Sequence, residues 1–315
     1  MAGHLTGTHR HPYFTLFVAA VALTVTMTDH TVNSLSIMSS KNNANHKKEL
    51  TMISFDLDDT LFPITETIQD ANDVMLRRMV EVGADPSLVT QESIRNATVM
   101  IRRDLENPIT YSELRTRAIE YELRRCCPEI SDVASTAKLV FESWLEERQR
   151  AANERLFPGV VECLEHLRSE YPDAKIVAIT NGRGSPMEMP ALRSLFDLCV
   201  SGEDDDVFPN RKPHRGIYEV ALAKADLFPL SSKKCWIHVG DDLANDVGGS
   251  ADCGAYAVLA TVVKHEEAKT IFWSTASEKE IAERKRKDII AQSKVSARIE
   301  KISELVQVVD EILLS

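Results

Sequence analysis

Short apolar runs that end in polar residues recur along the chain from residue 51 onward. A run of this kind is typical of a buried parallel strand, which delivers polar side chains at its carboxyl end. Five segments have this form: residues 52–55, 175–180, 198–201, 235–240 and 256–261. Segments with helical periodicity lie between them at residues 160–167, 217–225 and 243–253. This alternation predicts an α/β fold with a doubly wound parallel sheet, in which ligands bind beyond the carboxyl ends of the strands.

The alternation stops between residues 66 and 155, where the pattern is helical throughout. Apolar residues recur at helical intervals in two series: Ile68, Ala71, Met75, Met79 and Val82, then Val133, Ala137, Val140, Phe141 and Trp144. Thr110 and Glu113 have the spacing of a capping box that opens a further helix. We expect an α-helical insert of about four helices that overhangs the first strand and acts as a lid. The predicted domains are a core over residues 51–65 and 156–315 and a cap over residues 66–155.

The first 50 residues differ in composition from the rest and form a predicted N-terminal extension. Arg10 precedes an apolar run over residues 13–27, an order typical of a targeting segment, here residues 1–37. The run is shorter than the roughly 20 residues that a membrane-spanning helix needs, so no stable membrane span is expected. Polar residues 39–49 predict a disordered linker. An uncleaved extension, or a later translation start, stays an alternative to targeting.

Composition and charge narrow the function classes. The net charge of −11 argues against a nucleic-acid partner, because binding to a phosphate backbone needs clustered Lys and Arg. The six cysteines show neither a CxxC pair nor zinc-ligand spacing. This predicts reduced, mostly buried thiols and an intracellular location, in the cytoplasm or an organelle such as a plastid.

We expect residues 265–295 to form an exposed loop or helix, and residues 302–314 a helix that docks on the sheet.

The sharpest chemical signal follows the first predicted strand, in the segment Phe55-Asp56-Leu57-Asp58-Asp59-Thr60-Leu61. Alternation places Asp56 and Asp58 on the same side if the strand geometry continues. Two neighbouring carboxylates suit a Mg²⁺ site, because Mg²⁺ prefers hard oxygen ligands. They also suit a division of labour in which one carboxylate attacks and the other transfers a proton. Taken alone, the segment could equally be an acidic turn that closes a strand.

Three more groups lie at later strand ends. Thr180 and Asn181 offer a hydroxyl and backbone N–H groups that suit phosphate oxygens. Lys212 offers a cation that would neutralise charge on a transferred phosphoryl group. Asp241 and Asp246 add carboxylates after the fourth strand. Each group alone has an ordinary explanation, as a turn, a surface loop or a helix N-cap. Their occurrence in order at successive strand ends indicates a single site.

The order of these motifs resembles that of the haloacid dehalogenase superfamily, over residues 51 to about 262, and the helical insert is placed like the C1 cap of its phosphatases. The resemblance implies a Rossmann-like sheet and a Mg²⁺-dependent phosphatase that acts through an aspartyl-phosphate. Asp56 would be the nucleophile and Asp58 the general acid/base. An acid two residues after the nucleophile favours phosphate esters, since a departing halide needs no proton.

The resemblance also implies the ligand-binding residues. Three residues would hold the phosphoryl group: Thr180, Asn181 and Lys212. The Mg²⁺ ligands would be Asp56, Asp241 and the backbone carbonyl of Asp58. Asp246 would support the metal shell or the lysine. Asp59 and Asp242 match no invariant catalytic role in the family.

The expected partner is a small phosphorylated metabolite. The core motifs are similar to those of phosphatases that act on FMN and on 5-amino-6-(5-phosphoribitylamino)uracil. Sugar phosphates, phosphoglycolate and nucleoside monophosphates stay open, because specificity depends on the cap. There Tyr111 and Arg115 could contact a ligand or pack on the helix surface. A catalytically silent phospholigand-binding protein and a phosphomutase are the competing hypotheses.

Overall fold

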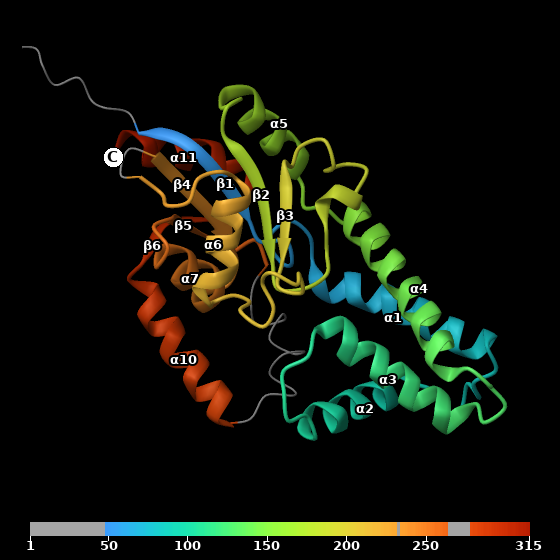
Figure 1. Ribbon diagram of the computed structural model, residues 1–315. Coiled ribbons are helices and arrows are strands. Elements are labelled where there is room, and N and C mark those ends of the chain that lie inside the picture. Colours follow the sequence, from blue (N-terminus) through green and yellow to red (C-terminus); the bar gives the residue numbers. More distant parts are fainter. Residues whose placement is uncertain (1–47, 232–233, 264–277) are drawn as a thin grey trace, which may run out of the picture. The chain divides into compact units, whose positions relative to one another are not determined.

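The computed structural model describes residues 48–231, 234–263 and 278–315, all within one compact unit (Figure 1). The predicted targeting segment lies outside the described residues, as do residues 264–277 of the segment expected to be exposed. Among the described helices, none is both long and apolar enough to cross a membrane. The six cysteines are free thiols, four of them buried and two partly buried.

A parallel sheet of six strands forms the centre of the structure, in the order β3-β2-β1-β4-β5-β6. The strands are β1 (Glu49–Phe55), β2 (Lys175–Thr180), β3 (Leu198–Ser201), β4 (Lys234–Gly240), β5 (Tyr256–Ala260) and β6 (Val295–Ile299). The chain fills one half of the sheet from β1 to β3 and then crosses to β4 on the other side of β1. The predicted doubly wound fold is confirmed, and the switch in direction lies between β1 and β4, where such sheets bind ligands.

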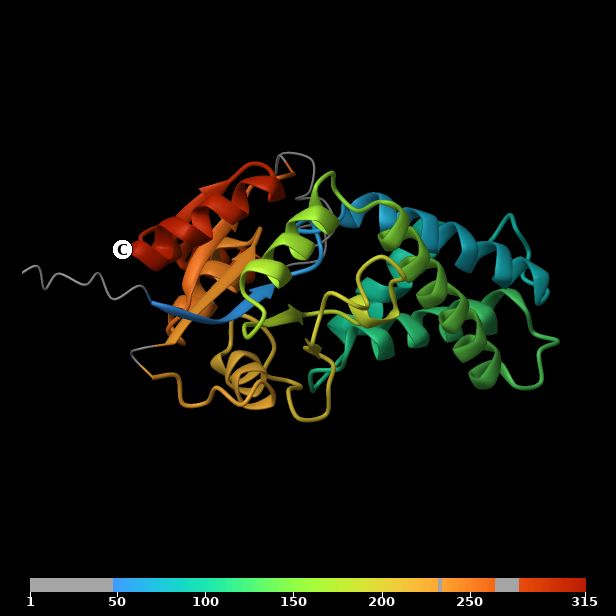
Figure 2. The same ribbon diagram turned by 90° about the horizontal axis from the view of Figure 1, so that it is seen from above.

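Helices cover both faces of the sheet. α5 (Val160–Glu170) and α11 (Leu305–Leu314) share one buried cluster with the strands, and α6 (Arg215–Lys224) belongs to another. Figure 2 shows α11 (red) and α5 (green) on one side of the sheet and α6 (gold) on the other. The predicted docking of the last helix is confirmed, since Leu305, Val309 and Leu313 are all buried.

Two parts of the sheet differ from the prediction. β1 begins at Glu49, inside the segment expected to be a linker, because Glu49 continues the parallel register with Lys234. β6 was not predicted, since only Ile299 is fully buried in this edge strand and its sequence lacks a continuous apolar run.

The predicted helix after β4 is irregular: η2 (Leu243–Gly248) is a π-helix that leads into the short α7 (Gly249–Ala251). α10 (Glu278–Gln292), mostly exposed as expected, precedes β6.

Four helices lie between β1 and α5, as predicted: α1 (Ile64–Glu81), α2 (Gln91–Arg103), α3 (Tyr111–Cys126) and α4 (Val133–Glu154). They enclose their own apolar cluster, which includes Met75, Leu123 and Trp144. The Thr110 side chain caps α3 by accepting from the Glu113 N–H at 3.0 Å, while the Glu113 carboxylate pairs with Arg117. A domain division at residues 66 and 155 stays a prediction.

Candidate active site

Asp56 stands directly after β1, at the switch between the two halves of the sheet. Its backbone N–H donates to the Val239 carbonyl of β4 at 2.8 Å, so the pairing of β1 with β4 reaches the predicted nucleophile. The chain then turns at Asp59, which adopts a left-handed φ of 57° that Asp tolerates. The Asp59 carboxylate accepts from the Ile64 N–H at 2.9 Å, at the first residue of α1. Asp59 therefore has a structural role in the turn.

Lys212 is the buried cation of the site, with 5% of its surface exposed. Its Nζ donates to the Asp56 carboxylate and, at 2.7 Å, to Oδ1 of Asp246. The Asn181 side chain holds the Lys212 backbone on both sides, accepting from its N–H at 2.7 Å and donating to its carbonyl at 3.1 Å. The Asn181 side-chain amide thus positions Lys212. The backbone N–H of Asn181 is the group predicted to serve a phosphate oxygen, and that role stays a prediction.

The turn after β4 folds the Asp246 carboxylate back against the end of that strand. Oδ2 of Asp246 accepts from the Asp242 N–H at 3.0 Å, while the Asp242 carboxylate caps η2 by accepting from Asn245 N–H at 2.6 Å. A Cβ at Gly240 would lie 2.3 Å from Cγ of Asp246, so only glycine leaves room for this carboxylate. Buried His238 supports it from behind, with Nε2 3.4 Å from Oδ1.

Three carboxylates converge at this point: oxygen atoms of Asp56, Asp241 and Asp246 all lie within 4.8 Å of one another. Burial raises the pKa of Asp56 to about 7, and the neighbouring Asp246 and Asp58 add to the rise while Lys212 opposes it. Burial also raises the pKa of Asp241 well above its ordinary value, with Asp246 and Asp56 contributing. Burial alone would raise the pKa of Asp246, but Lys212 and His238 together outweigh burial and lower this pKa.

The cluster fits a divalent cation. One lysine leaves an excess of buried negative charge among three carboxylates, and such an excess is costly unless another cation balances it. Carboxylate oxygens are the hard ligands that Mg²⁺ prefers. Asp241, predicted as a ligand, and Asp246, predicted as a supporting residue, both lie in this group with the predicted nucleophile.

Asp58 points toward the helical insert. Its Oδ1 accepts from Nη2 of Arg148 on α4 at 2.6 Å, and Arg148 is only 3% exposed. Sequence reasoning missed Arg148, although it continues the buried series of α4 that includes Ala137, Val140 and Trp144. The feature of the sequence that could have identified Arg148 is a cationic residue at a position of α4 that the helical period predicts to be buried. Because it contacts Asp58, Arg148 brings the insert into the site.

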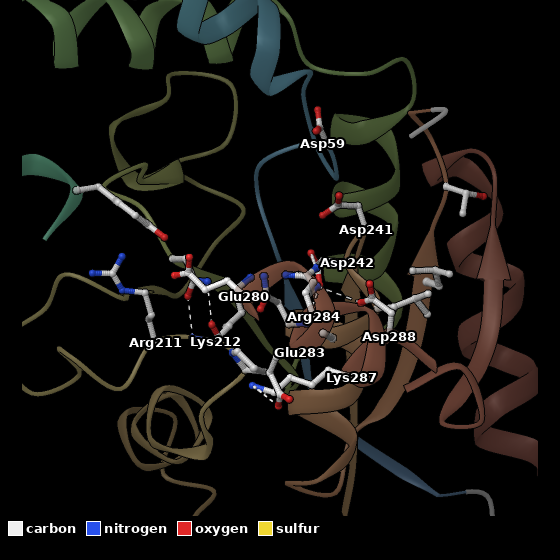
Figure 3. Close-up of a pocket in the computed structure, with 18 of the residues that line it drawn as sticks. Asp59, Arg211, Lys212, Asp241, Asp242, Glu280, Glu283, Arg284, Lys287 and Asp288 are labelled. Carbon is white, nitrogen blue, oxygen red and sulfur yellow. Dashed lines mark hydrogen bonds and ion pairs between the residues drawn. The ribbon is translucent and has the colours of Figure 1, made fainter. Parts of the chain in front are cut away.

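Thr180 and α10 also border the candidate active site. Thr180 is buried at the end of β2, where its Oγ1 accepts from the Gly182 N–H at 3.3 Å. A cavity of about 930 Å³ extends from Lys212 and Asp241 to α10, where Arg284 pairs with Asp242 (Figure 3). That α10 borders the site was not predicted from its charged, weakly periodic sequence.

Two curated proteins are similar to this chain in sequence over about two thirds of its length. A ribulose-1,5-bisphosphate 5-phosphatase of Halopiger xanaduensis is 26% identical over 66% of this chain and 84% of its own length. A glyceraldehyde 3-phosphate phosphatase of Methanopyrus kandleri is 24% identical over 68% of this chain and 85% of its own. Among solved structures, a 2-haloacid dehalogenase from Pseudomonas syringae shares the fold, with a TM-score of 0.60, 22% identity, and coverage of 84% of this chain and 99% of that one.

The sequence profile of a single family, described as haloacid dehalogenase-like hydrolase, matches residues 50–254. That range runs from β1 through the helical insert to the turn after β4, and contains all of the predicted site residues. The chain therefore belongs to the haloacid dehalogenase-like hydrolase family.

Proposed function

We propose that this hydrolase is a Mg²⁺-dependent phosphatase of small phosphate monoesters, in which Asp56 is transiently phosphorylated. The observation that carries the proposal is the convergence of Asp56, Asp241 and Asp246 around the buried Lys212 amine. Both curated relatives are named as phosphatases, which supports this reaction over dehalogenation. The presence of Asp58 supports it too, because a leaving alcohol requires a proton and a leaving halide does not.

The residues that would hold Mg²⁺ are the carboxylates of Asp56 and Asp241 and the backbone carbonyl of Asp58. When bound, Mg²⁺ offsets negative charge on the oxygen atoms of the phosphoryl group. Asp246 contacts Lys212 directly, so its proposed role is to orient the lysine and complete the acidic cluster.

In the proposed reaction a carboxylate oxygen of Asp56 bonds to phosphorus as the ester P–O bond breaks. Asp58 gives its proton to the departing oxygen, and then accepts a proton from the water that cleaves the Asp56 acyl phosphate. Lys212 neutralises charge on the equatorial oxygens, with the Thr180 hydroxyl as a further donor. Burial of Lys212 excludes water, which strengthens its attraction for the phosphoryl group.

The comparisons support sugar phosphates as the substrate class, since both curated relatives are named for phosphorylated sugars. The predicted resemblance to flavin-pathway phosphatases has no counterpart among these relatives. A phosphomutase stays a competitor, and it would require the Asp56 acyl phosphate to outlive attack by water.

The test is hydrolysis of p-nitrophenyl phosphate by the wild type and by Asp56→Asn, with and without Mg²⁺. We expect activity only with Mg²⁺, and a loss of at least about 10³-fold in kcat for the variant, because the nucleophile is gone. Asp173→Asn is the matched control: Asp173 is exposed before β2, at the opposite edge of the sheet. Equal rates for wild type and Asp56→Asn would favour the silent phospholigand-binding protein. Accumulation of a bisphosphorylated sugar would favour the mutase.

A further inference from the structure

A second, smaller cavity opens beside Asp58. Its volume is about 160 Å³. Residues from both the sheet side and the helical insert line it, including Asp58, Tyr111, Arg115, Trp144, Arg148 and Glu203. Since the proton that Asp58 transfers goes to the leaving oxygen, the group attached to that oxygen lies on this side of the phosphorus. We call this space the Asp58 cavity.

Two buried polar atoms of the lining residues have no hydrogen-bond partner in the part of the chain that the structure describes: Nη1 of Arg148 and Oε2 of Glu203. Arg148 is 3% exposed and Glu203 is 8% exposed. On the same two side chains, Nη2 of Arg148 donates to Asp58, and Oε1 of Glu203 accepts from the Ser112 N–H at 3.1 Å. An unsatisfied buried donor or acceptor costs about 1–3 kcal/mol, so a ligand that supplied one acceptor and one donor here would be stabilised.

Arg115 adds a second guanidinium. It lies over the Trp144 ring at 3.9 Å from the centroid, and its Nη1 donates to Asn72 at 3.1 Å. No carboxylate of the described residues forms an ion pair with it. Burial, with a contribution from Arg148, lowers the pKa of Arg115 to about 10. Hydrogen-bond acceptors of a ligand would stabilise both guanidinium groups.

We propose that the Asp58 cavity binds the leaving group of the substrate and selects a short hydroxylated chain. This inference rests on the proposed phosphatase function. One hydroxyl donates to Oε2 of Glu203, and a neighbouring oxygen accepts from Nη1 of Arg148. Glu203 is thus a specificity-determining residue, because only a ligand that donates a hydrogen bond satisfies its free oxygen.

Size and charge restrict the ligand further. The Asp58 cavity is smaller than the roughly 300–1,000 Å³ of drug-sized pockets, so the group it encloses is a short chain and not a fused ring system such as a flavin. Three arginines line the cavity, Arg115, Arg148 and Arg183, so only the space next to Oε2 of Glu203 disfavours a carboxylate or second phosphate, by repulsion between like charges. A neutral polyol chain meets both conditions.

The experiment compares sn-glycerol 3-phosphate with n-propyl phosphate, which has the same carbon chain without hydroxyls. We expect the full-length wild type to prefer glycerol phosphate by at least about tenfold in kcat/KM, because the analogue leaves buried polar groups unpaired. Glu203→Gln keeps an oxygen for the Ser112 N–H and replaces the free acceptor by a donor. This variant should lose at least about tenfold in kcat/KM on glycerol phosphate and much less on propyl phosphate, so that the wild-type preference between the two esters shrinks. Glu129→Gln, an exposed site on the insert, is the matched control.

Two results would overturn the assignment: equal wild-type activity on both esters, or a Glu203→Gln loss that is the same for both. A preference of the wild type for phosphoglycolate over glycerol phosphate would also overturn it. If Glu203→Gln fails to fold, the preference of the wild type for glycerol phosphate over propyl phosphate still tests the assignment. Failure of the proposed function is a different result, in which no ester, p-nitrophenyl phosphate included, is hydrolysed.

Discussion

At the scale of single residues, Lys212 is the group on which the site depends most. It is the cation that the structure places against both Asp56 and Asp246, and all three side chains are buried. Burial alone would lower the pKa of Lys212, but Asp246 and Asp56 outweigh it and raise this pKa. The lysine is therefore charged throughout the neutral range, and its removal leaves two buried carboxylates without a cation that neutralises them.

We predict that Lys212→Met reduces the free energy of unfolding by about 3–5 kcal/mol in the absence of Mg²⁺, because it leaves buried charges uncompensated. The reduction should be smaller in excess Mg²⁺, since a bound cation stabilises the folded state. Urea denaturation with and without Mg²⁺ measures both values.

The control for this prediction is Lys224→Met. Lys224 pairs with Asp204 and Asp206, but its side chain is 39% exposed, so its loss should cost less than about 1 kcal/mol. If both substitutions lowered the free energy of unfolding by the same amount, the buried ion pairs of Lys212 would contribute no more to stability than the exposed pairs of Lys224.

The sequence predicted the residues that act at strand ends better than those that act from the insert. Asp56, Lys212 and Asp241 follow or face strand ends, so the parallel sheet determines where they meet. Arg148 lies on α4 of the insert, and Glu203 lies in the loop after β3, where Ser112 of the insert contacts it. The directions of both side chains therefore depend on how the insert packs against the core. The role of Asn181 also required the structure, because its contact with Lys212 joins residues 31 positions apart.

At the scale of elements, the turn from β4 into η2 is the part of the fold most adapted to the site. It combines a glycine at the strand end, an aspartate N-cap and a π-helix, and it returns Asp246 toward Lys212. π-helical turns are rare and often occur at functional sites. The sequence predicted a helix here but not its irregular turn, because the wider π turn has no distinct apolar period.

Gly240→Ala tests this turn. The new Cβ would meet the Asp246 carboxylate, which must move away from Lys212. We expect a destabilisation of about 1–3 kcal/mol from overpacking, together with a loss of kcat. Thermal denaturation and the p-nitrophenyl phosphate assay measure the two effects.

A second glycine provides the matched comparison. A methyl group added at Gly182 would meet no atom of another part of the described chain within 4 Å, and Gly182→Ala should therefore leave the stability nearly unchanged. If Gly240→Ala retained full activity and stability, the close packing of the β4 turn against Asp246 would have no functional consequence.

At the scale of the whole described unit, one topological feature assembles the site. The strand order places β1 and β4 side by side at the centre, with β2 next to β1. Polar segments separated by up to 185 residues in the chain therefore end at one edge of the sheet. This arrangement followed from the alternation of strands and helices. The contribution of α10 did not, because a charged surface helix carries no pattern that says which surface it lies against.

The insert between β1 and α5 gives the site its second half. Arg148 of α4 contacts Asp58, and Ser112 of α3 contacts Glu203 in the loop after β3. The proposed proton-transfer residue and the proposed leaving-group cavity thus both depend on helices that the sequence predicted as elements but could not orient. Binding of substrate would strengthen these links, since it satisfies groups on both sides.

If Asp56 takes the phosphoryl group from the substrate, its acyl phosphate can be trapped during turnover. The wild type is mixed with Mg²⁺ and a hydrolysed ester, quenched with acid during turnover and treated with borohydride, which reduces an acyl phosphate to an alcohol. Peptide mass spectrometry then locates the reduced residue. We predict reduction at position 56, dependent on substrate and absent from Asp56→Asn. Turnover of the ester with position 56 unmodified, or with the modification at another carboxylate, would contradict the account.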